Sequence, residues 1–222
     1  MKLEGKIIDF LGDSITEGAG VTDTKNNRFD NILARECKLA AAKNYGIGGS
    51  RIAHQSVPSE KPRFDLCFCG RVYNIDHKAD AVVVFGGTND YGHGDAPIGK
   101  IGDKTPATFC GAVYFLMNYL NENFKKKGKE VLFLAPARRW GDEKIAIHPC
   151  KKEDALPLRE YNKIIMETGE QLGIPVLDLY EKLGINPNDE AQRKAYTTDG
   201  LHFNDEGHKV IAAKVREFLE SL

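Results

Sequence analysis

The 222-residue sequence predicts an α/β protein of three layers, an α/β/α sandwich with a central parallel sheet between two layers of helices. Two observations support this fold class. Short apolar runs alternate along the chain with longer segments whose apolar residues recur at helical spacing. The runs are nearly continuous, which is typical of strands buried on both faces of a parallel sheet. Right-handed crossovers would place helices on both faces, and residues 1–222 are expected to form one domain.

Most predicted strands end at a glycine or a proline. The clearest is the β-branched run at 80–85, which Gly86 and Gly87 terminate. The segment at 40–45 is less regular, but its position between a helix and a glycine-rich turn favours a strand. Strands are expected at 6–11, 40–45, 80–85, 130–135 and 175–179.

The clearest helix follows at 108–127, with one apolar face that includes Leu116 and Leu120. Three lysines and Gly128 close it, which suits the negative end of a helix dipole followed by a glycine stop. Helices are expected at 28–39, 108–127, 158–172 and 206–222. Between them lie an irregular connection at 51–78 with room for one helix, an extended loop at 91–106 and a second irregular stretch at 138–156.

Composition limits the classes of partner. Lysine and arginine number 31 against 32 acidic residues, so the chain offers no field for gathering nucleic acid or anionic lipid. No apolar stretch is long enough to suggest a membrane span, and the first residues lack the features of a signal peptide. The five cysteines are scattered, which favours free thiols over a disulfide framework or a zinc site. We therefore expect a cytoplasmic protein without metal or cofactor.

A polar motif, Gly-Asp-Ser at 12–14, follows the first predicted strand directly. Gly12 is expected to provide the tight exit from the strand by adopting φ angles that other residues avoid. Ser14 would then stand past the carboxyl end of the strand, where α/β proteins bind their ligands. Three further stretches, at 44–49, 86–90 and 199–202, are expected at the same edge of the sheet.

These stretches contain the groups that ester cleavage requires. A serine hydroxyl needs a base, and His202 is the best of six histidines because Asp199 lies three residues before it. One short loop could carry both, with the carboxylate fixing the tautomer of the imidazole. The backbone N–H groups of Ser14 and Gly49 and the side-chain amide of Asn89 are candidate donors to an oxyanion.

Other polar residues near these stretches allow two interpretations. His93 is placed in the glycine-rich loop near Asn89 and is a candidate substrate contact. Arg138 and Arg139 follow the strand at 130–135 and could hold a substrate carboxylate or phosphate, although solvated surface arginines fit equally well. Asp13 and Asp90 are expected to make local hydrogen bonds that hold their turns.

Each motif alone also fits an ordinary turn, but their joint occurrence in this order favours a hydrolase. Gly12-Asp13-Ser14, Gly49, Gly87-Thr88-Asn89-Asp90 and Asp199-x-x-His202 resemble the four blocks of the GDSL, or SGNH, hydrolases. The first block has Ile15 where the family name has leucine. In the second block, Gly46 and Gly48 compete with Gly49, and alignment on Asn44 favours Gly49.

The resemblance implies a flavodoxin-like sandwich, a triad of Ser14, His202 and Asp199, and an oxyanion hole from Ser14, Gly49 and Asn89. The expected activity is a serine esterase that forms an acyl-serine intermediate, acting on small acyl groups such as acetyl on a carbohydrate or small metabolite. A thioesterase or lysophospholipase of the same family is the alternative. A non-catalytic ligand-binding protein on the same scaffold would be expected to lack a triad member, and none is missing.

Overall fold

The computed structural model describes residues 1–151 and 153–222. Its centre is a five-stranded sheet in which every pair of neighbouring strands is parallel. The strands are β1 (Ile7–Gly12), β2 (Ala41–Gly46), β3 (Ala81–Phe85), β4 (Glu130–Ala135) and β5 (Val176–Asp178). All five lie within one residue of the predicted bounds at either end, so the apolar runs identified the sheet correctly.

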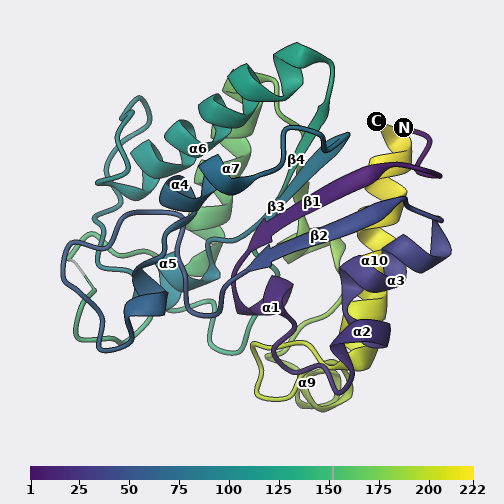
Figure 1. The fold of residues 1–222 in the computed structure, drawn as a ribbon. Coiled ribbons are helices and arrows are strands. Elements are labelled where there is room, and N and C mark those ends of the chain that lie inside the picture. Colours follow the sequence, from purple (N-terminus) through teal and green to yellow (C-terminus); the bar gives the residue numbers. More distant parts are fainter. Residues whose placement is uncertain (152) are drawn as a thin grey trace.

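The strand order is β2-β1-β3-β4-β5 (Figure 1). The chain runs from β1 to β2 on one side and then returns to place β3 on the other side of β1. The order therefore reverses between β1 and β3. This is the flavodoxin-like order, and the crevice beyond the carboxyl ends at such a switch point is where open α/β sheets bind ligands.

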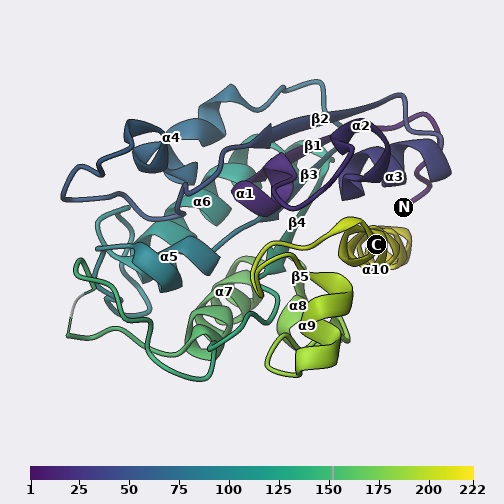
Figure 2. The ribbon, with the colours of Figure 1, turned by 90° about the horizontal axis from the view of Figure 1, so that it is seen from below.

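Helices cover both faces of the sheet, which confirms the three-layer prediction (Figure 2). One face packs against α3 (Phe29–Glu36) and α10 (Asp205–Ser221), and the other against α4 (Phe68–Arg71), α6 (Phe109–Asn123) and α7 (Leu158–Leu172).

Strand β3 shows why its sequence is continuously apolar. Val82 and Val84 belong to the core beneath α6 and α7, whereas Ala81, Val83 and Phe85 belong to the core beneath α3 and α10. Successive side chains point to opposite faces of a strand, so every side chain of β3 packs into one of the two cores.

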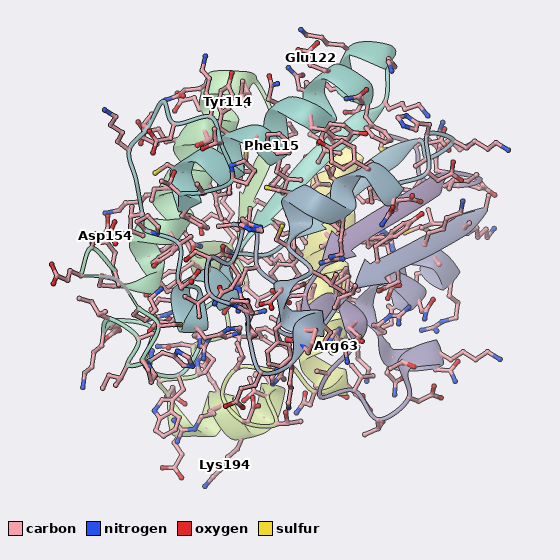
Figure 3. The ribbon with its side chains drawn as sticks, turned by 60° about the vertical axis from the view of Figure 1, so that its left-hand side comes forward. Arg63, Tyr114, Phe115, Glu122, Asp154 and Lys194 are labelled. Carbon is pink, nitrogen blue, oxygen red and sulfur yellow. The ribbon has the colours of Figure 1, made fainter. Side chains whose placement is uncertain are left out.

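Helix α6 runs along the outside of the sandwich, and the labelled Tyr114, Phe115 and Glu122 lie along it (Figure 3). It ends at Asn123, four residues before the predicted end. Phe124 leaves helical geometry and is fully buried, and the lysines at 125–127 form a 3-10 turn. Burial of the Phe124 ring thus overrides the helical preference of the lysine run.

Five short helices were not predicted, because segments of four to seven residues show too little periodicity. They are α1 (Ser14–Glu17), α2 (Thr24–Asn27), α5 (Thr88–His93), α8 (Leu179–Lys182) and α9 (Glu190–Tyr196). Helix α5 corrects the predicted loop at 91–106, whose first three residues are helical. The connection at 51–78 contains α4 and two 3-10 turns, at Pro62–Asp65 and Val72–Asn74.

Within residues 1–151 and 153–222, no helix combines the length and apolar character that a bilayer span requires. The five cysteines are free thiols, and only Cys150 is more than slightly exposed.

Candidate active site

A cleft of about 950 Å³ lies at the carboxyl edge of the sheet, next to the switch point. Ser14, the first residue of α1, and Asn89, in α5, reach it from the ends of β1 and β3. Gly49 comes from the segment after β2, and His202 from the loop before α10. The structure thus brings together four segments that are far apart in the sequence.

The turn that carries Ser14 depends on close packing at Gly12. A Cβ at this position would lie 1.9 Å from Thr16 Oγ1 and 2.9 Å from the Phe85 carbonyl oxygen. The φ angle of Gly12 is not positive, so the reason expected from the sequence was wrong. Glycine is required here because α1 folds back directly onto the end of β1.

Ser14, His202 and Asp199 form a continuous chain of hydrogen bonds. Ser14 Oγ lies 3.0 Å from His202 Nε2, and His202 Nδ1 lies 2.7 Å from Asp199 Oδ2. Ser14 is buried, whereas the Asp199 side chain is 51% exposed. An imidazole held in this way can accept the serine proton while the carboxylate stabilises the resulting imidazolium.

The ionised form of Asp199 is stabilised by its own loop. Burial acts to raise its pKa, but hydrogen bonds outweigh this effect and the pKa is lowered overall. Its Oδ1 accepts the backbone N–H groups of Leu201 at 2.9 Å and His202 at 2.7 Å. The carboxylate therefore stays charged at neutral pH and fixes the loop that presents the imidazole.

The loop is closed at its base by a bridge between Thr197 and Phe203. The Gly200 N–H donates to Thr197 Oγ1, and the Gly200 carbonyl accepts the N–H of Trp140 at 2.8 Å. These contacts connect the loop to the segment after β4, so the position of His202 is set from two elements.

Three N–H groups at the cleft are available to an oxyanion. Among the described residues, none accepts a hydrogen bond from the backbone N–H of Ser14 or of Gly49. By contrast, the Gly48 N–H donates to Glu17 Oε2 at 2.8 Å. The side-chain nitrogen of Asn89 donates one of its two protons to the Ser50 carbonyl at 2.9 Å, and the other proton remains.

Backbone conformation and packing both require glycine at position 49. Its φ is +76°, and a Cβ would lie 2.2 Å from the ring of Phe64, which also lines the cleft. Gly46, in contrast, does not line the cleft.

Two buried aspartates hold backbone segments around the cleft. Burial raises the pKa of Asp13 to about 7, and its side chain caps α1 by accepting the Ile15 N–H, as expected. Asp90 does not hold its own turn: its two oxygens accept the N–H groups of Ile52 and Ala53 at 2.9 and 2.8 Å. The expectation of local bonds was therefore wrong for Asp90, which anchors the segment after Gly49 instead.

Arg71 is a supporting residue that the sequence did not indicate. Its guanidinium is largely buried and donates to the carbonyls of Gly12 at 3.0 Å and Tyr45 at 2.6 Å and to Ser50 Oγ at 2.8 Å. It thereby joins the ends of β1 and β2 to the segment that follows Gly49. A lone arginine in an irregular connection gives no periodic signal from which this role could be read.

The three predicted substrate contacts have different positions. His93 is the last residue of α5 rather than part of a loop, and it lines the cleft with Arg139. Arg139 lies over the ring of Tyr91, and no carboxylate among the described residues forms an ion pair with it. Arg138 does not line the cleft, because it binds Asp142 at 3.2 Å and Glu143 at 2.7 Å.

No group of three or more His, Cys, Asp or Glu side chains suited to a metal ion occurs in the described part of the chain. The reactive groups that the structure brings together here are a serine hydroxyl, an imidazole, a carboxylate and a set of N–H donors.

Solved structures with the same fold include two hydrolases. A lipase/acylhydrolase from Enterococcus faecalis shares 20% identity at a TM-score of 0.62, over 97% of this chain and 96% of that chain. An acetyl xylan esterase shares 24% identity at a TM-score of 0.63, over 95% and 98%. At these identities the likeness concerns the fold alone.

A protein from Lactobacillus plantarum is more similar, with 31% identity and a TM-score of 0.82 over 99% of this chain and 98% of that chain. No curated protein matches the sequence. The model of the GDSL-like lipase/acylhydrolase family matches residues 10–210, a range that includes every motif of the cleft. The chain therefore belongs to the GDSL-like lipase/acylhydrolase family.

Proposed function

We propose that this protein is a serine esterase with Ser14 as nucleophile, His202 as general base and Asp199 as the carboxylate that orients the base. The observation that carries the proposal is the hydrogen-bonded chain from Ser14 Oγ through both nitrogens of His202 to Asp199. His202 takes the serine proton as Oγ attacks the ester carbonyl, and then returns it to the departing alcohol. Water activated by the same imidazole then releases the acid from acyl-Ser14.

The proposed oxyanion hole consists of the N–H groups of Ser14 and Gly49 and the free amide proton of Asn89. The lack of a protein acceptor for the two backbone groups, within the described residues, supports this assignment. Donors that are fixed before the reaction stabilise the tetrahedral oxyanion without reorganising during it.

For the substrate, we propose a small acyl group, acetyl first, on a carbohydrate or other small metabolite. Polar and charged side chains such as Gln55, Glu60 and Lys61 line part of the cleft and suit a polar alcohol portion, whereas the larger part of the exposed surface inside it is apolar. A thioester or lysophospholipid remains the alternative substrate. The free thiols suit a reducing compartment, so we propose the cytoplasm as the location.

The test is hydrolysis of p-nitrophenyl esters from acetate to decanoate by the wild type and by Ser14→Ala. We expect the highest kcat/KM with acetate and a loss of about 10⁴-fold or more in the variant. A phosphonofluoridate should label the wild type at Ser14 and leave Ser14→Ala unlabelled. Ser221→Ala, which changes an exposed serine far from the cleft, is the control.

Equal rates in the wild type and Ser14→Ala would refute the nucleophile. A maximum at decanoate would retain the nucleophile and move the substrate to lipids or thioesters. Absence of both turnover and labelling would favour a binding protein.

A further inference from the structure

A chain of hydrogen bonds in the wall of the cleft connects Asp65 to Asn89 through two further side chains. Arg51 Nη2 lies 2.9 Å from Asp65 Oδ1, and Arg51 Nη1 lies 2.7 Å from His93 Nδ1. His93 Nε2 lies 3.2 Å from Asn89 Oδ1, and Asn89 Nδ2 donates to the Ser50 carbonyl at 2.9 Å. The Arg51 side chain is only 2% exposed, although it carries a charge.

The direction of each bond follows from the chemistry of arginine. A guanidinium can only donate, so His93 Nδ1 must accept and its ring proton must lie on Nε2. Burial, aided by the Arg51 charge, lowers the pKa of His93 to about 4, so the ring is neutral at pH 7 as this assignment requires. The Nε2–H then donates to Asn89 Oδ1.

This direction fixes the orientation of the Asn89 amide. With its oxygen towards His93, its nitrogen faces Ser50, and only one of the two amide protons is used there. A flipped amide would oppose its NH₂ to the Nε2–H and its oxygen to the Ser50 carbonyl, and both bonds would be lost. The remaining proton is thus held in one direction, and the adjacent charge strengthens it as a donor.

We propose that Arg51 and His93 are positioning residues that hold the Asn89 amide with one proton directed at the oxyanion formed on Ser14. This inference rests on the proposed function. It also gives His93 a role different from a polar substrate contact, because both of its ring nitrogens are already engaged.

The test compares His93→Phe, which keeps the ring volume but removes the donor, with His93→Gln, whose amide can donate to Asn89. With p-nitrophenyl acetate we expect His93→Phe to lower kcat about 30-fold with KM within about threefold. This is less than the about 10²–10³-fold cost of losing an oxyanion donor, because the Asn89 amide is still present but is no longer held by His93. His93→Gln should recover kcat to within about fivefold of the wild type. His54→Phe, at an exposed histidine outside this cleft, is the control.

A double-mutant cycle with Asn89→Ala separates positioning from general disruption. If His93 acts through Asn89, His93→Phe should lower kcat less than about twofold in the Asn89→Ala background. Arg51→Met should behave like His93→Phe, but it also leaves Asp65 without its ion pair, so the His93 variants carry the test.

Each other outcome has a defined meaning. An equal loss from His93→Phe in both backgrounds, or no recovery in His93→Gln, would overturn the positioning role and leave the esterase proposal intact. Full activity in Asn89→Ala would remove Asn89 from the proposed oxyanion hole, and with it this inference. Failure of Ser14→Ala to lose activity would refute the proposed function itself.

Discussion

Replacement of Asp199 measures what a half-exposed carboxylate contributes to the proposed triad. Its Oδ2 lies 2.7 Å from His202 Nδ1 and its side chain is 51% exposed. Two unit charges 4 Å apart interact by ~4 kcal/mol at an effective dielectric constant of ~20 and by ~1 kcal/mol in water. Since solvent reaches this carboxylate, ~2 kcal/mol of imidazolium stabilisation is a reasonable value between these limits. We therefore expect Asp199→Ala to lower kcat about 30-fold.

Asp199→Asn removes the same charge and adds a second penalty. The oxygen of the asparagine would keep the backbone N–H bonds of Leu201 and His202, which leaves its NH₂ facing His202 Nδ1. That NH₂ would donate to Nδ1 and move the ring proton to Nε2, where the lone pair is needed for Ser14. Breaking one such hydrogen bond costs ~1.5 kcal/mol, so we expect a total loss of about 300-fold.

The assay is the initial rate of p-nitrophenyl acetate hydrolysis, with the melting temperature of each variant as a check on folding. Glu206→Gln, which removes an exposed charge seven residues further along, is the matched control. A variant Asp199→Asn that is faster than Asp199→Ala would refute the tautomer argument. Losses in both that equal the loss in Ser14→Ala would show that exposure does not weaken this carboxylate.

Two further predictions concern recognition and stability. Arg139→Gln should lower the ratio of kcat/KM for 4-acetoxybenzoate to kcat/KM for its methyl ester about tenfold, because Arg139 lines the cleft. Arg138 is held in a salt bridge, so Arg138→Gln should leave this ratio unchanged. Equal effects of the two substitutions would exclude Arg139 as an anion contact. Burial lowers the pKa of His208 to about 4, so its stabilising contribution is present above pH 6.5 and is lost as pH falls towards 4, by ~3 kcal/mol. Urea unfolding from pH 7 to 4 should show this slope in the wild type and a smaller one in His208→Asn, and identical slopes would contradict it.

The sheet could be predicted from the sequence because a strand that is covered on both faces is a nearly uninterrupted run of apolar residues. Val82, Val83 and Val84 are all buried, so no polar residue interrupts the run. The long helices could be predicted because their apolar residues recur at helical spacing. Short helices such as α1 and α5 have one turn or little more, and Ser14 and Asn89 both lie on helices of this kind.

The side chains gathered at the candidate site could be predicted where a motif names them, and not where packing decides their position. Ser14, Asp199 and His202 follow from their order and spacing. The burial of Arg51 and the contact between Arg51 and His93 depend on how two irregular segments fold against each other. Such segments have no period, so neither residue could be assigned a partner from the sequence.

The distance along the chain between the proposed nucleophile and its proposed base has a consequence for protein synthesis. Ser14 and His202 are 188 residues apart. A ribosome synthesises the N-terminal segments first, so the five strands, Gly49 and Asn89 are all translated before the base. Without an imidazole beside it, the serine hydroxyl is unreactive towards esters. With Ser14 and His202 in their proposed roles, the growing polypeptide cannot cleave esters during translation, and a fragment that stops before residue 199 is inactive.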